Sequence, residues 1–400
     1  MNKKVIIVGG GIAGLATSLF LKKAGIKSEI YEQAPAFSKK GGSFVVHPNG
    51  MKVLKELNLG EELKSNSHQI TDFKFMSSEG VPLFDESDLG EFSDLGNEFE
   101  LINISRYHLI RVLHEKAAKE GIEIKFGKKI MSIEQCPSHV TAFFEDGTQT
   151  TGDILIGADG VNSRTRSILF PNQLLNYAGK WAIWGVLSPE RLKENRHYFD
   201  REASTIFLHE NFNLFVSKHH QTDEDRLSWT MIVNEKRKLP KKHFEALPLE
   251  QLKKEVAARF SNWAMPIGEL ILNTETFIPK QLYSIEPMSR FSAGRVVLIG
   301  DALHTTDPNT GFGTTLGLED AMYLSKMLRD HLDHEDAFYY YEYDRKDRAH
   351  SIHKGVKEME SLTDFSFLND INPEELEKFF GLDYHIDWEQ TEDSKKTEPV

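Results

Sequence analysis

The chain begins with blocks of apolar and polar positions that predict a strand, a helix and a second strand. Lys3–Val8 is a short apolar run, rich in Val and Ile and bounded by glycine, which is typical of a strand buried in a parallel sheet. The next segment predicts a helix that reaches about Ala24 and is ended by Gly25. Ser28–Tyr31 predicts the second strand. This order indicates an α/β domain built on parallel strands.

Two regions far downstream repeat the pattern of a strand followed by a loop and a helix. Asp153–Ala158 is a predicted strand that follows a hairpin with its turn at residues 145–147. Arg295–Ile299 is another, and a loop containing proline and glycine separates it from a helix that we expect to begin near Gly313. Both strands are expected in the domain that the first two begin.

The segment between these regions has a different pattern, with short alternating runs that predict strands of an antiparallel sheet. The predicted strands are Ala182–Leu187, Ser204–His209, Asn213–Lys218 and Leu227–Val233. A hairpin around Gly80, made of Thr71–Met76 and Val81–Phe84, is expected to join this sheet, and Leu249–Trp263 predicts a helix. Alternation along 204–209 places Phe207 and His209 on one face of the sheet.

The C-terminal part predicts one long helix over residues 337–362. Tyr339–Tyr341 and Tyr343 are expected to pack inward, and Arg345 and Arg348 to pair with acids. Residues 361–385 predict a closing helix, and the polar stretch from His385 to Val400 is expected to be disordered.

Composition and charge narrow the class of protein. The chain has 400 residues, 40% of them hydrophobic, which indicates two domains or one large elaborated domain. A net charge of −13 argues against nucleic acid as the main partner. One cysteine, Cys136, excludes a disulfide framework, and no apolar run is long enough to span a membrane. We expect a cytoplasmic protein without a metal centre.

The first strand leads into a dinucleotide fingerprint. Gly9, Gly11 and Gly14 form G-x-G-x-x-G at the turn into the helix, where they permit a tight turn, an approach of the backbone to a pyrophosphate, and close packing of helix on strand. Glu32 ends the second strand eighteen residues after Gly14 and suits a ribose diol. The nucleotide is therefore FAD or NAD rather than NADP, and this stretch alone leaves the two open.

The downstream regions favour FAD, because a long cofactor has a second end to bind. Asp301 follows a predicted strand and can hydrogen-bond a polyol. The helix N-terminus near Gly313 can stabilise the negative charge that a reduced flavin ring carries. One FAD would then have its ADP end at Gly9–Glu32 and its ribityl and ring end at Asp301–Gly313.

The three motifs in this order resemble the class A flavoprotein monooxygenases, which include p-hydroxybenzoate, salicylate and urate hydroxylases and tetracycline-inactivating enzymes. Besides the fingerprint, the D-G motif of that family matches at Asp159, Gly160, Ser163 and Arg166, and its G-D motif at Gly300, Asp301, His304, Pro308, Gly311 and Gly313. Arg106 matches an arginine on the flavin side of the cofactor. The usual glutamine of G-Q-G is Phe312 here, and the following asparagine is replaced in Thr314-Thr315.

The resemblance implies a Rossmann-like FAD-binding domain with an inserted antiparallel β-sheet substrate domain and C-terminal helices. The FAD-binding parts would be residues 1–70, 100–176 and 286–360, with a β-hairpin insertion at 71–99, a substrate domain at 177–285, and a C-terminal helix and tail at 361–400. We expect a monomer or a small homo-oligomer.

The resemblance also implies the site. The expected cofactor contacts are Gly9, Gly11, Ala13, Gly14, Glu32, Arg106, Asp159, Gly160, Asp301, Pro308, Gly311, Gly313 and Thr314, with Arg106, Pro308 and Gly313 near the flavin ring. The candidate substrate contacts are Trp184, Phe207, His209, Phe215, Trp229 and Phe312.

The implied activity is hydroxylation of a small aromatic or heteroaromatic compound with NAD(P)H and O₂, through a flavin C4a-hydroperoxide. The protein would position substrate and exclude water, since the cofactor carries the chemistry. Two alternatives remain: an FAD-dependent oxidase or reductase that inserts no oxygen, and a non-catalytic flavin-binding protein. A flavin-dependent halogenase is disfavoured because its W-x-W-x-I-P motif is missing, and an NAD dehydrogenase because it needs no second strand, loop and helix of this kind.

Overall fold

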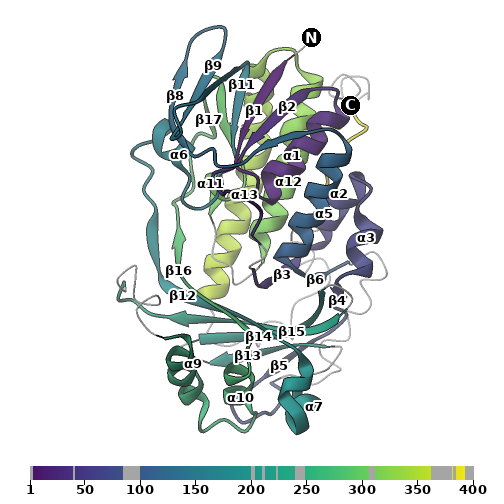
Figure 1. Cartoon of the computed structure of the whole chain (residues 1–400), viewed down its shortest axis with the longest axis vertical. Coiled ribbons are helices and arrows are strands. Elements are labelled where there is room, and N and C mark those ends of the chain that lie inside the picture. The colour runs from purple at the N-terminus through teal and green to yellow at the C-terminus, as the bar shows by residue number, and fades with distance from the viewer. Residues whose placement is uncertain are drawn as a thin grey trace.

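The computed structural model describes residues 3–38, 41–83, 100–199, 203–209, 212–221, 224–238, 248–305, 311–361, 381 and 384–391. Two layered bodies lie one above the other in Figure 1. The upper one packs helices on a mainly parallel sheet, and the lower one is built on a broad antiparallel sheet. Helices and sheets of this kind confirm the mixed α/β class.

The upper sheet has six strands in the order β17-β18-β11-β1-β2-β7. Their bounds are β1 Lys4–Val8, β2 Lys27–Tyr31, β7 Glu123–Lys125, β11 Ile154–Gly157, β17 Ser292–Ala293 and β18 Val296–Leu298. The central strand β1 pairs in parallel with β2 and β11, and β11 pairs in parallel with β18. The strand patterns at the start, middle and end of the chain therefore meet in one sheet, as predicted.

Helices cover this sheet, and its central strand is buried on both faces. The larger helices are α1 Ile12–Lys23, α2 Pro48–Glu56, α5 Arg106–Lys119, α12 Phe312–Asp330 and α13 His334–Ser361, with shorter ones at α3 Gly60–Ser65, α6 Arg164–Leu169 and α11 Asp301–His304. Val5, Ile6 and Ile7 are fully buried. The helices α1 and α12 lie close together because Ala13 faces Gly300 and Gly317, whose added Cβ atoms would lie 3.1 and 3.4 Å from the Ala13 Cβ.

Two further sheets are small: one lies beside the upper sheet, and the other lies between the upper helices and the lower sheet (Figure 1). The first, in the order β10-β9-β8, contains β8 Ile130–Gln135, β9 Val140–Phe144 and β10 Gln149–Gly152. Its hairpin turns at residues 145–147, as the sequence predicts. The second, in the order β3-β6-β4, contains β3 Ser43–Val46, β4 His68–Gln69 and β6 Ile102–Ser105.

The lower sheet has the order β16-β12-β15-β14-β13-β5. Its strands are β5 Phe73–Met76, β12 Asn176–Leu187, β13 Ser204–His209, β14 Phe212–Gln221, β15 Glu224–Asn234 and β16 Thr276–Ser284. The long strands β12 and β16 lead from this sheet toward the upper body (Figure 1). Strand β5 joins the sheet beside β13, as predicted for the Gly80 hairpin. Residue 84 of its second arm lies outside the described residues.

One face of the lower sheet carries helices α9 Leu249–Ala257 and α10 Ile267–Leu272, joined through the 3-10 turn η2 Ala258–Phe260. A 3-10 turn η1 Pro189–Asn195 and helix α7 Arg196–Phe199 lie at the end of β12. The helix predicted over Leu249–Trp263 is therefore shorter. Within the described ranges, no helix has both the length and the apolar character needed to cross a bilayer.

The C-terminal part corrects two expectations. Along α13 only Tyr341 packs inward, fully buried, whereas Tyr339, Tyr340 and Tyr343 are exposed. The stretch that begins at His385 is not disordered throughout, because Trp388 is 4% exposed and packs on Phe20 with ring centroids 5.2 Å apart. Residues 362–380 and 392–400 lie outside the described residues, and so do the predicted closing helix and the end of the tail.

Candidate active site

The glycine loop at the end of β1 has two crowded positions and one open position. Gly9 has φ +112°, and an added Cβ would lie 2.3 Å from the carbonyl oxygen of Ala158. A Cβ on Gly14 would lie 2.0 Å from the carbonyl oxygen of Gly9, whereas a Cβ on Gly11 meets no atom within 4 Å. Gly9 and Gly14 therefore serve chain packing, and Gly11 leaves space at the N-terminus of α1, where backbone N–H groups favour an anion.

Glu32 lies at the end of β2, directly beside this loop. Its carboxylate accepts hydrogen bonds from the backbone N–H of Gly10 and of Ala34, each at 2.7 Å. Each oxygen has a second acceptor site, so the carboxylate can still accept the two hydroxyls of a ribose. The loop and the acid thus fit the adenosine end of a dinucleotide, as the spacing predicts.

Hydrogen bonds within the D-G motif after β11 fix the conformation of its loop. The carboxylate of Asp159 accepts hydrogen bonds from the Ser163 hydroxyl at 2.5 Å and from the backbone N–H groups of Arg164 at 2.8 Å and Thr165 at 2.9 Å. Gly160 has φ +76° and an open side. Asp159 therefore fixes the conformation of its own loop, and its expected contact with the cofactor stays a prediction.

Arg166 connects the D-G motif to the G-D motif. Its side chain is buried, and its guanidinium donates to the carbonyl oxygens of Ala302 at 3.0 Å and Asp301 at 3.3 Å. A further N–H donates to the carbonyl of Val161 at 2.7 Å. The sequence matched Arg166 to a motif without giving it a role, and the structure shows that it holds the two downstream motifs together.

Asp301 follows β18 and begins the short helix α11. Its side chain is accessible to solvent but has many protein groups around it. The resulting desolvation raises the pKa of Asp301, and the positive charges of His304, Arg106 and Arg166 act to lower it. Desolvation likewise lowers the pKa of Arg106, while Asp301 and Glu32 act to raise it. Arg106 thus interacts electrostatically with both acids, so Glu32, Arg106 and Asp301, from three separate parts of the chain, lie in one region of the upper body.

The start of α12 differs from the sequence prediction. The helix begins at Phe312, after Gly311 with φ +71°. Phe312 is 4% exposed and stacks on the His47 ring, with centroids 3.9 Å apart and an interplanar angle of 5°. It is therefore part of the core, and its expected contact with substrate stays a prediction. Gly313 and Thr314 are partly accessible in the first turn, and Pro308 lies outside the described residues.

A buried ion network supports this segment from behind. Asp320 accepts hydrogen bonds from the Gly300 N–H at 2.8 Å, from His304 Nε2 at 2.5 Å and from Arg345 Nε at 2.9 Å. Glu319 beside it pairs with Arg345 and Arg348. The predicted pairing of both arginines with acids is confirmed. The role of Asp320 was missed, although two adjacent acids in an apolar helix are a signal that could have shown it.

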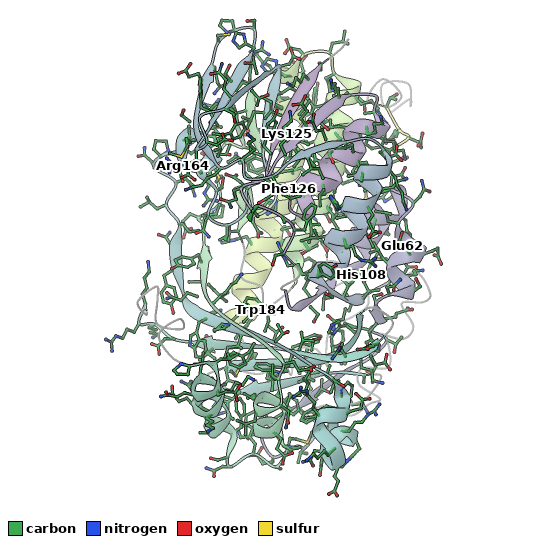
Figure 2. The ribbon with its side chains drawn as sticks, viewed as in Figure 1. Glu62, His108, Lys125, Phe126, Arg164 and Trp184 are labelled. Carbon is green, nitrogen blue, oxygen red and sulfur yellow. The ribbon has the colours of Figure 1, made fainter. Side chains whose placement is uncertain are left out.

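The lower sheet turns two of the candidate aromatic residues toward the upper body. Trp184 lies opposite Thr230, which in turn lies opposite Phe215, so the three side chains share one face of the sheet. A Cβ added to Gly42 would lie 2.7 Å from the Trp184 Cβ, so this face lies against the segment before β3. Figure 2 labels Trp184 on that side of the sheet.

The other three aromatic candidates of the sheet face the helices. Phe207 and Trp229 are almost fully buried, and Trp229 Nε1 donates to the hydroxyl of Thr274 at 2.9 Å. His209 stacks on Phe212, with ring centroids 4.5 Å apart, and lies tilted against Trp263 at 6.1 Å. Phe207 and Trp229 belong to the core under α9 and α10, and His209 shares the face of Phe207, so the expected contact of these three residues with substrate stays a prediction without support from their position.

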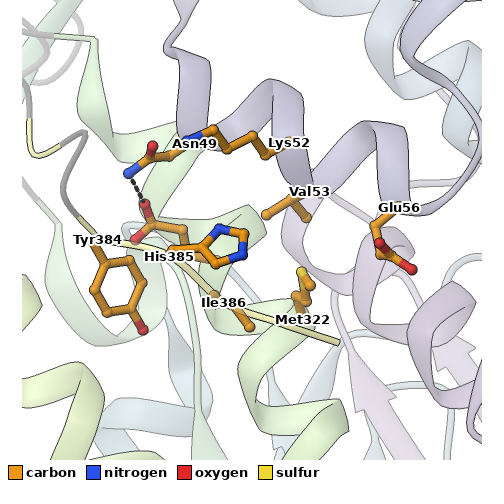
Figure 3. Close-up of a pocket in the computed structure, with 9 residues that line it drawn as sticks. Asn49, Lys52, Val53, Glu56, Met322, Tyr384, His385 and Ile386 are labelled. Atoms are coloured by element: carbon orange, nitrogen blue, oxygen red, sulfur yellow. Dashed lines mark hydrogen bonds between the residues drawn. The ribbon is translucent and has the colours of Figure 1, made fainter. Parts of the chain in front are cut away.

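A small cavity of about 70 Å³ lies elsewhere, between α2, α12 and the C-terminal segment. Figure 3 shows its lining, where the amide of Asn49 donates to Glu319 at 3.4 Å. Its volume is well below the roughly 300 Å³ that a small-molecule site needs. The cavity is a packing gap behind the ion network, and the recess around Arg106 and Asp301 remains the candidate site.

Comparison with known proteins identifies the family. Residues 2–355 match the profile of the FAD binding domain family. The chain belongs to this family. The match spans the glycine loop, the D-G motif, the lower sheet and the G-D motif, so the family frame includes both bodies of the structure.

Several proteins that are similar to this chain over most of its length are monooxygenases. A 6-hydroxynicotinate 3-monooxygenase of Pseudomonas fluorescens is 28% identical over 358 residues, which cover 88% of this chain and 90% of that protein. An FAD-dependent urate hydroxylase of Klebsiella pneumoniae is 28% identical over 373 residues, 87% of each. The solved structure of Klebsiella pneumoniae HpxO with FAD and uric acid is 25% identical, has a TM-score of 0.76, and covers 98% of this chain and 94% of that one.

These findings confirm the resemblance that the motifs indicate. The protein is an FAD-dependent monooxygenase, an oxidoreductase that uses NAD(P)H as its electron donor. The solved 2,6-dihydroxypyridine-3-hydroxylase of Arthrobacter nicotinovorans, 24% identical with a TM-score of 0.78 over 90% of this chain and 92% of that one, has the same fold.

Proposed function

We propose that the protein hydroxylates a small aromatic or heteroaromatic compound, with NAD(P)H and O₂, in the recess between the two bodies. The observation that supports this most strongly is the convergence of Glu32, Arg106 and Asp301, which lie far apart in the sequence, opposite a sheet face that carries Trp184 and Phe215. The named substrates of its relatives, 6-hydroxynicotinate and urate, are both small heteroaromatic compounds.

The residues of this recess fit FAD from end to end. The open side of Gly11 and the N–H groups of α1 suit the pyrophosphate, and Glu32 suits the ribose. The accessible carboxylate of Asp301 suits the hydroxyls of the ribityl chain, and the first turn of α12 at Gly313 suits the ring. When bound, FAD supplies the redox chemistry, accepting hydride equivalents from NAD(P)H and activating O₂.

The chain itself contributes placement, charge and exclusion of water. The guanidinium of Arg106 provides positive charge in the recess, and the N-terminus of α12 adds a partial positive charge that stabilises a developing anion. Trp184 and Phe215 provide a flat apolar surface on which an aromatic ring can pack away from water. We infer that the lower sheet serves as the substrate domain.

A screen of small heteroaromatic compounds tests this function. We expect at least one compound to stimulate NAD(P)H oxidation by the FAD-loaded protein and to yield a product heavier by one oxygen in mass spectrometry. Stimulated oxidation without any mass gain would favour the oxidase or reductase alternative. A protein that holds FAD and responds to no compound would favour the non-catalytic alternative.

Two aromatic substitutions provide matched variants for the same assay. Trp184→Leu removes an aromatic ring from the recess and is expected to raise the KM for the substrate about 3- to 10-fold, the value of a lost aromatic contact. Phe207→Leu changes the core under α9 and α10 and is expected to lower the unfolding midpoint with the KM unchanged. Equal effects of both on KM would contradict the assigned face.

A further inference from the structure

The first turn of α12 begins with a residue between two glycines. Phe312 stands between Gly311 and Gly313, and Gly311, the N-cap residue, has φ +71° and no side chain that could cap the helix. Glycine leaves the backbone freer than any other residue does. The backbone alone therefore fixes this turn weakly, and contacts of side chains from other elements have to hold it in place.

His47 makes such contacts with this turn. Its ring stacks on Phe312, with centroids 3.9 Å apart and an interplanar angle of 5°, and both side chains are buried. The backbone N–H of His47 donates to the hydroxyl of Thr315, one turn along the helix, at 3.3 Å. Phe312 also packs in a buried cluster with Leu316 of α12 and Ile352 of α13. His47 therefore holds the first turn of α12 both by its ring and by its backbone.

His47 lies on the short link between β3 and α2, where it is the N-cap residue of α2. Gly311 lies close to the same link. A Cβ added to Gly311 would lie 3.4 Å from Nε2 of His47 and 3.4 Å from the Cβ of Val45. The link and the start of α12 are therefore in close contact, although they are more than 260 positions apart in the sequence.

The place of this turn matters because the flavin ring is expected to bind at it. The N-terminus of a helix carries a partial positive charge, and its effect on an anion falls off within the first turn. The negative charge of a reduced flavin ring is therefore stabilised to an extent that depends on where the turn lies. A contact that fixes the turn would then also determine how much more tightly the protein binds reduced FAD than oxidised FAD.

We propose that His47 is a positioning residue that holds the first turn of α12 against the flavin ring through its stack on Phe312. The inference rests on the proposed function for the place of FAD, and it goes beyond that function by giving a role to a residue outside the three motifs. The stack uses a flat ring and not a charge. His47→Phe is therefore expected to preserve the role, and His47→Leu to remove it.

The midpoint potential of the bound FAD tests this proposal. It is measured during anaerobic reduction of the FAD-loaded full chain beside a reference dye. His47→Leu is expected to weaken the binding of reduced FAD about 3- to 10-fold more than that of oxidised FAD, which lowers the two-electron potential by about 15 to 30 mV. His47→Phe is expected to keep the potential of the natural protein.

Two further variants separate the stack from a general loss of structure. Phe312→Leu removes the partner ring and is expected to lower the potential as His47→Leu does, and the double variant is expected to lower it no further. His331→Leu is the matched control at the other end of α12, where His331 stacks on Tyr340 with ring centroids 4.7 Å apart. This control is expected to leave the potential unchanged.

Three results would overturn the proposal. The first is a natural potential in His47→Leu, or in Phe312→Leu if His47→Leu does not fold. The second is a potential in His47→Phe as low as that in His47→Leu, because the ring would then not be the cause. The third is an equal fall in His331→Leu. A chain that shows the expected shifts but oxygenates no compound would contradict the proposed function and leave the role of His47 standing.

Discussion

At the scale of single residues, a substitution at Gly11 is expected to weaken cofactor binding without affecting folding. Because its side is open, Gly11→Val is expected to fill the space beside the N-terminus of α1 without disturbing the chain. We expect the affinity for FAD to fall at least about 100-fold, a loss of roughly 2.7 kcal/mol. The apoprotein should keep its unfolding midpoint. Flavin fluorescence titration and thermal unfolding of the same sample measure both.

Gly14→Ala is the matched comparison within the same loop. Its Cβ would lie 2.0 Å from the Gly9 carbonyl oxygen, so this small change should lower both the unfolding midpoint and the affinity for FAD. If Gly11→Val destabilised the apoprotein as much as Gly14→Ala, the open space beside Gly11 would not be a cofactor site.

Asp301 is expected to bind FAD at the expense of stability. Its pKa is raised in the folded protein, so the folded state favours the protonated carboxyl and loses stability as the pH rises through that pKa. Asp301→Asn removes this loss, and we expect a higher unfolding midpoint of the apoprotein at pH 7. The affinity for FAD should fall about 10- to 100-fold, because a charge-assisted hydrogen bond is replaced by a neutral one.

Calorimetric unfolding of the apoprotein between pH 5 and 8 tests the expected gain in stability, and FAD titration tests the expected loss of affinity. A variant that loses stability and keeps its affinity for FAD would show that Asp301 is a structural residue.

Residues with local roles could be predicted from the sequence, and residues placed by distant contacts could not. The roles of Gly9, Gly14 and Glu32 follow from spacing along one strand, one turn and one helix. The burial of Phe312 could not be predicted, because its direction is set by the ring of His47, 265 positions away. The hydrogen bonds that Asp159 accepts within its own loop could not be predicted from the motif alone.

At the scale of elements, the buried pairs between α12 and α13 hold the G-D segment in place. Arg345 is fully buried, and it pairs with Glu319 at 2.8 Å and Asp320 at 2.9 Å. Arg345→Met leaves two buried carboxylates without their cation and is expected to cost about 3 to 5 kcal/mol of unfolding free energy. Lys346→Met, next along the helix at a more exposed position, should cost under about 0.5 kcal/mol. Urea unfolding at pH 7 measures both, and equal costs would contradict the network.

The same network gives a dependence of stability on pH. The pKa of Asp320 is lowered to about 2, although burial alone would raise it, because His304 and Arg345 stabilise its charge. Its contribution is thus present above the ordinary value of 3.8 and is lost as the pH falls toward 2. The pKa of His304 is raised above 6.5 by Asp320, against the effect of burial, so its contribution is present below 6.5 and is lost as the pH rises through the raised pKa.

The unfolding midpoint of His304→Gln should therefore fall furthest below that of the natural protein between about pH 4 and 6.5, where His304 and Asp320 are both charged. Unfolding midpoints of the two proteins across pH 4 to 9 test this. A difference that grows with rising pH would contradict the assigned pair.

The bounds of helices and strands were predicted well where hydrophobic periodicity defines them. The face that an element buries was predicted less well, because it depends on which other elements pack against it. Alternation along β13 separates Phe207 from Ile206 correctly, but it does not tell which face meets the helices. That choice depends on α9 and α10, which cover the Phe207 side and leave the Trp184 side to the recess. The parallel character of the upper sheet was predictable because strands buried on both faces are continuous apolar runs, whereas the order of the strands was not predicted.

At the scale of the whole molecule, segments far apart in sequence are brought together by buried contacts. Arg166 connects the D-G motif to the G-D motif, and the C-terminal segment returns to α1 through Trp388. The return of this segment was not predicted, because Tyr384, Ile386 and Trp388 stand in a short stretch whose other residues are mostly polar. Its docking depends on Phe20 of α1 and on Arg329, whose guanidinium lies 4.7 Å from the Trp388 ring centroid.

The central claim is that the beginning and the end of the upper body bind opposite ends of one FAD. The most direct test is the FAD content of the purified chain, measured by its absorption spectrum after gel filtration in the presence of added FAD. We expect close to one FAD per chain in the natural protein. A colourless protein that takes up no FAD on reconstitution would contradict it.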